Sequence, residues 1–456
     1  HHALPIIDFS RKRLDSIELY PYQRLINEGL SSVMVAHLEV PALELKKNLP
    51  SSLSEQIISG ILKDEMNFKG LVFTDALNMK GVTNHGKNGD AEVNAFLAGN
   101  DMLLMPTEVK KAKEKLTKAY GKGKITEERL AESVKKILMA KYKAGLHKYK
   151  PVAIENLFED LNSLEDDLVY EEAIENAITV VKNDFYLMGI KRLENKKIAY
   201  VKFGDANSTP FITELNKYAK VTQVNGKDIA TLKGKLKDYN LVIIGYHKSN
   251  ETPWKGYKFS KTELSWLQEI AKERESNLIL TTFVKPYALL DVTSFKGIDG
   301  VVVAYQNSKL AQEKAAQLIF GAIPAKGKLP VTSHEDFPVN TSVQLKALLR
   351  LGYSFPERVG MSSTMLAKVD ELVQDGLDSL MYPGAQVLIA RKGKVIYNKG
   401  FGKPTYDSKE KITTEHIYDL ASITKILGTL PVVMKMEEDG EIALNDTFEE
   451  LVPEYS

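Results

Sequence analysis

The fold is decided by a stretch that ends in a carboxylate, Gly70-Leu71-Val72-Phe73-Thr74-Asp75. Its apolar residues are continuous, which is typical of a parallel strand covered on both faces. Similar runs lie at Ser32-Val33-Met34-Val35-Ala36-His37 and Asp101-Met102-Leu103-Leu104-Met105. Helical patterns from Ser54 to Met66, and from residue 91 to a capping glycine at 99, separate these runs. The alternation predicts an α/β domain with parallel strands.

This first region, residues 1–150, supplies three predicted strands. A closed (β/α)8 barrel needs eight. The region is therefore either a small open sheet or the C-terminal half of a barrel.

A second α/β pattern follows an acidic helical connector at residues 151–180. Strands are expected at Lys197–Phe203, Leu241–Tyr246, Asn277–Phe283 and Gly300–Ala304, with helices at about 209–219, 260–275 and 308–320. Gly321 and Pro324 close the last helix. Residues 181–332 are thus predicted to form a complete doubly wound domain.

A third pattern follows a predicted linker at residues 333–360. In residues 361–456, an amphipathic helix at Leu366–Leu380 precedes two extended runs, 384–390 and 395–402, around a polar turn that contains Gly393. These runs predict an antiparallel hairpin. No later segment closes this sheet before residue 456.

The composition of the 456 residues is that of a globular protein, with 43% hydrophobic and 27% charged residues. The net charge of +1 gives no reason to expect nucleic acid or an anionic membrane as a partner. Cysteine is absent, which excludes disulfides, thiolate metal sites and a cysteine nucleophile. No apolar run reaches the roughly 18 residues that would span a bilayer.

Asp75 is the first candidate catalytic residue. At the carboxyl end of a buried strand it is a nucleophile or base, or else a cap of the next helix. Residues 68–79, together with 91–104, resemble the nucleophile segment of glycoside hydrolase family 3. The resemblance implies that Asp75 is the nucleophile and that residues 1–150 are part of a TIM barrel. Residues 295–305, 311–321 and 327–332 resemble the α/β sandwich domain of the same family.

His1-His2-Ala3-Leu4-Pro5 looks like the end of a family 3 signature whose histidine is the acid/base in the β-N-acetylglucosaminidase branch. By that resemblance His1 is the acid/base, a task that fits an imidazole with a pKa near 6.5. The alternative is that His1 and His2 remain from a purification tag. The resemblance also puts His37 and Met79 near the sugar, although His37 could simply be a core or rim histidine.

Ser422 and Lys425 form the second candidate site, an S-x-x-K spacing that puts a hydroxyl and an amine on one helix face. The same spacing at Ser133 and Ser408 is expected to be solvated. The context of Ser422 resembles the serine β-lactamase and penicillin-binding-protein superfamily, which implies that Ser422 is the nucleophile and Lys425 its base. The alternative is a helix cap at Ser422.

The expected fold is therefore α/β, with the C-terminal part of a TIM barrel, an α/β sandwich and the start of an α+β β-lactamase-like domain. The expected function is a retaining hydrolase that releases β-linked N-acetylglucosamine, plausibly from peptidoglycan fragments, with no metal or cofactor. A β-glucosidase, a non-catalytic wall-binding protein and an esterase or peptidase are the alternatives. The cell envelope is the expected location and the cytoplasm its alternative. We also expect the chain to be one part of a longer protein.

Overall fold

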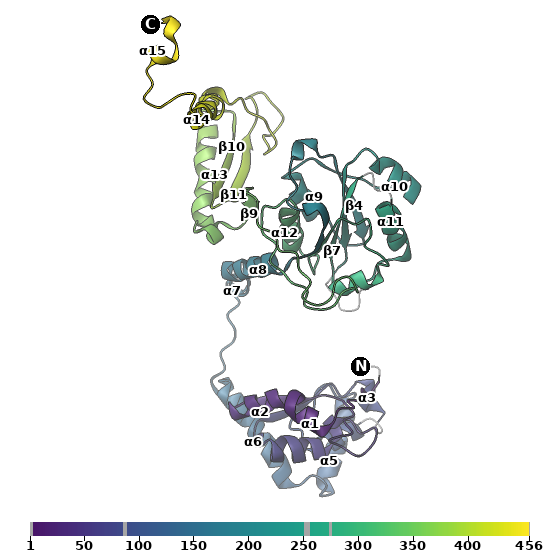
Figure 1. Cartoon of the computed structure of the whole chain (residues 1–456). Coiled ribbons are helices and arrows are strands. Elements are labelled where there is room, and N and C mark those ends of the chain that lie inside the picture. The colour runs from purple at the N-terminus through teal and green to yellow at the C-terminus, as the bar shows by residue number, and fades with distance from the viewer. Residues whose placement is uncertain (1–2, 85–88, 250–255, 273–275, 456) are drawn as a thin grey trace. The chain divides into compact units, whose positions relative to one another are not determined.

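The computed structural model describes residues 3–84, 89–249, 256–272 and 276–455. It divides into two compact units, His1–Glu155 and Asn156–Ser456 (Figure 1). Within the described ranges, every helix is too short or too polar to cross a bilayer.

The N-terminal unit is built on two parallel strands, β1 (Ser32–Val35) and β2 (Leu71–Thr74). Their register runs from Ser32 opposite Leu71 to Val35 opposite Thr74. A Cβ added at Gly70 would lie 2.4 Å from the carbonyl oxygen of Ser31, so glycine is needed where the two strands begin. The first two predicted strands are confirmed, although both are shorter than expected.

The third predicted strand, residues 101–105, is wrong as a strand and is reduced to one bridge between Phe73 and Met102. The reason is that side chains replace the backbone ladder on both sides of this bridge. The Asp101 carboxylate accepts from the backbone N–H of Val72, and the Thr74 hydroxyl accepts from that of Leu104. The segment is still held beside β2, but without a continuous ladder.

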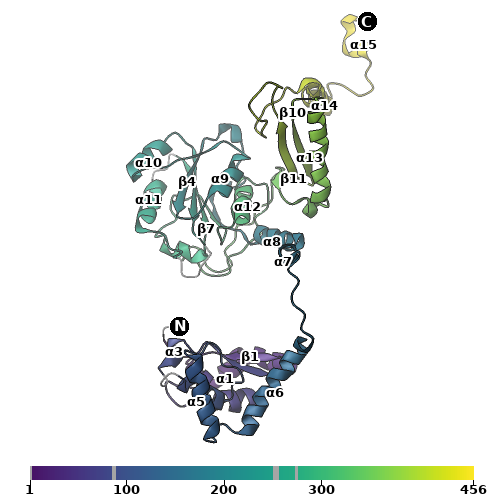
Figure 2. The ribbon, with the colours of Figure 1, turned by 180° about the vertical axis from the view of Figure 1, so that it is seen from behind.

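Helices pack around this short sheet: α6 contacts β2 and lies near β1 in Figure 2, and α5 packs against α4. The helices of this unit are α1 (Arg11–Arg13), α2 (Tyr20–Asn27), Gln56–Glu65, α3 (Lys80–Thr83), α4 (Asp90–Ala98), α5 (Val109–Gly121) and α6 (Glu127–Lys143). The helix predicted from residue 54 is the Gln56–Glu65 helix. It ends with a π-type bond, from the Met66 N–H to the Ile61 carbonyl. Gly99 caps α4 at a φ of 118°, as predicted.

The second unit contains a six-stranded sheet in the order β3-β8-β7-β6-β4-β5. Its strands are β3 (Thr179–Asn183), β4 (Ile198–Gly204), β5 (Val221–Gln223), β6 (Leu241–His247), β7 (Asn277–Phe283) and β8 (Gly300–Val303). The four predicted strands are all present. The pattern missed β5, which has only three residues. It also missed β3, an antiparallel edge strand that begins inside the predicted connector.

Alternate residues of these strands belong to two separate hydrophobic clusters. One cluster joins the sheet to α10 (Ile229–Leu236) and α11 (Lys261–Lys272). The other joins it to α9 (Thr209–Asn216), α12 (Lys309–Ile319) and α8 (Leu164–Ala177). Figure 1 shows α10 and α11 on the side of the sheet away from α9 and α12. Helices therefore cover both faces, as continuous apolar strands require.

The last part of the chain forms a three-stranded sheet, β10-β11-β9. The predicted hairpin is confirmed as β10 (Gly384–Arg391) and β11 (Lys394–Gly402), and α13 (Ser363–Asp378) is the predicted amphipathic helix. β9 (Gly352–Tyr353) comes from the predicted linker and pairs in parallel with β11. The linker is thus part of the packed structure. The chain continues through α14 (Leu430–Glu438) and α15 (Phe448–Leu451).

Candidate functional site

Asp75 directly follows β2, at the carboxyl end of the strand, and its side chain is partly exposed. Its backbone N–H donates to the carbonyl of Val35 at the end of β1. One carboxylate oxygen, Oδ1, accepts from the N–H of Ala76 at 2.7 Å. Among the described residues, no hydrogen bond is found to the other oxygen, Oδ2. A carboxylate with one oxygen held and the other free of hydrogen bonds can act as a nucleophile, as aspartates of glycosidases do.

His37 lies beneath this turn and is 4% exposed. Its Nδ1 is 2.6 Å from the Ser52 hydroxyl, and its Nε2 is 3.0 Å from the Ala76 carbonyl oxygen. Burial lowers the pKa of His37, while the hydrogen bond to Ala76 and the charge of Asp75 oppose that change. The sequence placed His37 near the sugar. The structure places it against the Asp75 turn, with both ring nitrogens within hydrogen-bond distance of a partner.

Met79 follows the same turn and is the N-cap residue of α3. Its backbone N–H donates to the Ala76 carbonyl at 3.1 Å. The chain start also reaches this region, because a Cβ at Gly81 would lie 3.6 Å from the Ala3 carbonyl oxygen. His1, the predicted acid/base, and His2 lie outside the described residues. The structure therefore brings together Asp75, His37 and Met79.

Ser422 and Lys425 are brought together in the second unit, with Lys425 Nζ 3.2 Å from Ser422 Oγ. Both residues are exposed. The helix expected to open at Ser422 is instead three consecutive pieces, a 3-10 turn at Ala421–Ile423, a π-type turn at Lys425–Thr429 and then α14. Pro431 has no N–H to donate to the backbone carbonyl one turn earlier. The regular hydrogen bonding of an α-helix is therefore interrupted in that turn. The structure gives Ser422 no capping hydrogen bond at these helix starts.

The other two S-x-x-K spacings carry no such pair, but the prediction that Ser133 is solvated is wrong. Ser133 is 1% exposed and donates to the buried carboxylate of Asp101. Arg129 Nη1 donates to the Ser133 hydroxyl at 2.6 Å, and Lys136 Nζ lies 3.5 Å from Asp101 Oδ2. The polar face of α6, which the sequence predicted to be solvated, therefore holds this helix against Asp101 beside β2.

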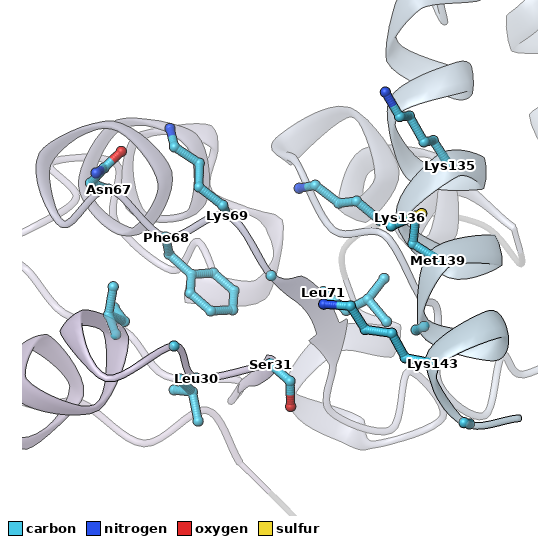
Figure 3. A pocket seen from close by; sticks show the side chains of 15 residues that line it. Leu30, Ser31, Asn67, Phe68, Lys69, Leu71, Lys135, Lys136, Met139 and Lys143 are labelled. Carbon is cyan, nitrogen blue, oxygen red and sulfur yellow. The ribbon is translucent and has the colours of Figure 1, made fainter.

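A cavity of about 770 Å³ lies at the opposite end of the strands, beside Ser31 and Gly70. Figure 3 shows Lys69, Lys136 and Lys143 around it, with Phe68 and Leu71 between them. Catalytic groups of parallel α/β folds gather at the carboxyl ends of the strands. The turn at Asp75, at the other end of β2, is therefore the better candidate. Among the described residues, no acidic and histidine side chains cluster in a way that would hold a metal ion.

Sequence reasoning missed Ser51 and Ser52, which hold His37 in place, and Ala76, which links His37 to Asp75. The two hydroxyls lie in Pro50-Ser51-Ser52, and Ser52 is 15 residues from His37, so no local spacing in the sequence links them. A serine pair in a turn is common, so only the three-dimensional contact identifies its role.

Two family models match the chain. Residues 1–140 match the glycosyl hydrolase family 3 N-terminal domain, and residues 369–456 match the beta-lactamase model. The chain combines a family 3 glycoside hydrolase segment with a beta-lactamase-like segment. The resemblances read from residues 68–79 and around Ser422 are thereby confirmed at the level of the family.

Curated relatives match different parts of the chain. Beta-hexosaminidase A of Pseudoalteromonas piscicida is 24% identical, over 73% of this chain and 63% of its own length. Protein flp of Staphylococcus aureus (strain N315) is 34% identical over 88 residues, which is 19% of this chain and 18% of that protein.

Solved structures agree on the fold. A family 3 β-N-acetylglucosaminidase from Paenibacillus sp. str. FPU-7 has a TM-score of 0.57 at 24% identity, over 75% of this chain and 65% of that one. Beta-glucoside phosphorylase BglX has a TM-score of 0.62 at 23% identity, over 73% and 63%. The chain spans less than two thirds of the length of each of these proteins.

Proposed function

We propose that this chain belongs to a retaining glycoside hydrolase that releases terminal β-linked N-acetylglucosamine, with Asp75 as its nucleophile. The observation that carries the proposal is the Asp75 carboxylate, open on one side at the carboxyl end of β2, inside the segment that matches family 3. A relative named Beta-hexosaminidase A supports the choice of sugar. In this proposal residues 1–150 are the C-terminal half of a TIM barrel.

The proposed reaction uses Asp75 as the nucleophile and His1 as the acid/base. Asp75 attacks the anomeric carbon and forms a glycosyl ester, while the bond to the leaving oxygen breaks and protonated His1 gives that oxygen its proton. Water then attacks the same carbon, His1 takes the proton from this water, and the ester bond to Asp75 breaks. Met79 would lie beside the sugar, and His37 would lie behind the Asp75 turn.

The test is turnover of a chromogenic N-acetylglucosaminide by the protein that carries this chain. Asp75→Ala should abolish turnover, because the proposed ester with the Asp75 carboxylate can no longer form. Asp64→Ala, an exposed carboxylate on the Gln56–Glu65 helix, is the matched control and should keep wild-type turnover. Wild-type turnover by Asp75→Ala would refute the assignment.

The substrate is proposed to be a peptidoglycan fragment and the location the cell envelope. Faster turnover of a plain β-glucoside than of the N-acetylglucosaminide would favour a β-glucosidase instead. Tight binding of muropeptides without any turnover would favour a wall-binding protein. Addition of phosphate in place of water would yield a sugar phosphate, which distinguishes phosphorolysis from hydrolysis.

A second activity is favoured by the 3.2 Å contact between Lys425 Nζ and Ser422 Oγ. A neutral Lys425 amine would take the Ser422 proton as Ser422 Oγ attacks an acyl carbon, and would pass that proton to the leaving group as the bond to the leaving group breaks and the acyl-serine ester forms. Water would then cleave this ester and release the acid and free Ser422. A fluorophosphonate or penicillin probe should label the wild type and Ser408→Ala, but not Ser422→Ala. Equal labelling of Ser422→Ala would rule out this nucleophile, and so would no labelling of the wild type.

A further inference from the structure

His37 has no ring nitrogen left for a ligand. Nδ1 faces the Ser52 hydroxyl and Nε2 faces the Ala76 carbonyl, both within hydrogen-bond distance. Because a carbonyl oxygen only accepts, Nε2 must carry a proton, and Nδ1 of the neutral ring then accepts from Ser52. A residue in this state cannot donate to or accept from a sugar without giving up one of these bonds.

The Ser51–Leu53 turn holds His37 from both sides. The Ser51 hydroxyl donates to the Ala36 carbonyl at 2.8 Å and accepts from the Leu38 N–H at 3.2 Å, which fixes the backbone on either side of His37. Ser52, itself fully buried, fixes the ring, and its own carbonyl accepts from Asn100. The imidazole is therefore locked in position by groups that come from three parts of the chain.

The Ala76 carbonyl is the point where this support meets the candidate site. It accepts from His37 Nε2 at 3.0 Å and from the Met79 N–H at 3.1 Å. The N–H of the same residue donates to Asp75 Oδ1 at 2.7 Å. The orientation of Ala76 thus sets both the carboxylate that would attack and the start of α3.

We propose that His37 is a positioning residue, which sets Asp75 and Met79 relative to each other through the Ala76 carbonyl instead of contacting the sugar. The proposal rests on the proposed glycosidase function for its effect on rate, but not for its effect on structure. Burial keeps the ring neutral, consistent with its lowered pKa.

The test compares two substitutions that differ in one hydrogen bond. Glutamine places an amide N–H near the position of Nε2, so His37→Gln keeps a donor for Ala76, whereas His37→Leu removes it. A misplaced nucleophile costs about 100-fold in rate. We therefore expect His37→Leu to lower kcat for an N-acetylglucosaminide by about 100-fold with little change in KM, and His37→Gln to recover most of that loss. His147→Leu, an exposed histidine in the same unit, should leave kcat unchanged.

A second readout does not depend on turnover. Backbone hydrogen exchange in residues 75–79 should be faster in His37→Leu than in the wild type, and close to wild type in His37→Gln. Unchanged exchange in His37→Leu would overturn the proposal, as would a raised KM at unchanged kcat, which is the result expected of a direct sugar contact. If the wild type itself shows no turnover, the glycosidase function fails while the exchange result still decides the role of His37. If His37→Leu does not fold, Ser52→Ala replaces it in the same comparison.

Discussion

The two candidate sites are held in opposite ways. Asp75 lies in a turn that is fixed by β1, by the buried His37 ring and by the Ser51–Leu53 turn, all distant in sequence. Ser422 and Lys425 are three residues apart, exposed, and joined by one hydrogen bond within their own segment. The difference teaches that local spacing is enough to predict the second pair, whereas the first site depends on the fold around it. Changes in distant support should therefore damage the Asp75 site far more than comparable changes damage the Ser422 site.

The largest effect is expected from Asp101, the buried carboxylate under the strand layer. Asp101→Ala removes the carboxylate that accepts from the Val72 N–H and from the Ser133 hydroxyl. It also leaves Arg129 and Lys136 without this ion-pair partner. Breaking a buried ion pair by removing one partner costs about 3–5 kcal/mol, and we expect a loss of that order in the free energy of unfolding of the N-terminal unit. Denaturant unfolding followed in this unit measures it.

The matched change beside the second site is Lys435→Ala on α14. Lys435 pairs with Glu438 and Asp439, and all three side chains are well exposed. Exposed pairs of this kind contribute no more than about 1 kcal/mol. If Asp101→Ala lowered the free energy of unfolding by as little as Lys435→Ala, the contrast between the two sites would be wrong.

A smaller effect is expected from two glycines. A Cβ at Gly70 would meet a backbone oxygen at 2.4 Å, so Gly70→Ala should cost about 1–3 kcal/mol in unfolding free energy. A Cβ at Gly428, between Ser422 and α14, would meet only the Thr424 methyl at 3.5 Å. Gly428→Ala should therefore leave stability unchanged or raise it by up to about 1 kcal/mol. Equal effects of the two substitutions in thermal unfolding would contradict this account.

The smallest effect is a dependence on pH that only the Asp75 site should show. Because burial lowers the pKa of His37, the folded state holds the ring neutral while the unfolded state takes up a proton below about pH 6.5. The stabilisation of the folded state by the neutral His37 ring is complete above that pH. It is lost as the pH falls toward the lower pKa that the ring has in the folded state. Hydrogen exchange of residues 75–79, corrected for its intrinsic pH dependence, should accelerate on acidification in the wild type and not in His37→Gln. Acceleration of equal size in both proteins would show that another group is responsible.

Much of the fold follows from pattern alone, because continuous apolar runs such as Leu241–His247 and the hairpin around Gly393 are long and clearly bounded. The misses have physical reasons. β5 is too short to give a pattern, and the run at residues 101–105 was not a strand because Asp101 and Thr74 bond through their side chains. Asp75, Ser422 and Lys425 could be named from motifs. The roles of Ser52 and Ala76 in holding His37 could not be predicted from motifs, because a hydroxyl and a backbone carbonyl carry no signal until the chain is folded.

The central claim, that Asp75 is a nucleophile, is tested most directly by trapping its ester. An activated fluorinated N-acetylglucosaminide, which forms the glycosyl-enzyme faster than water removes it, is added to the protein that carries this chain, and the labelled peptide is located by mass spectrometry. The account predicts one added sugar on the peptide that contains Asp75, and no label in Asp75→Ala. A sugar attached to another residue, or turnover of this substrate with Asp75 never labelled, would contradict it.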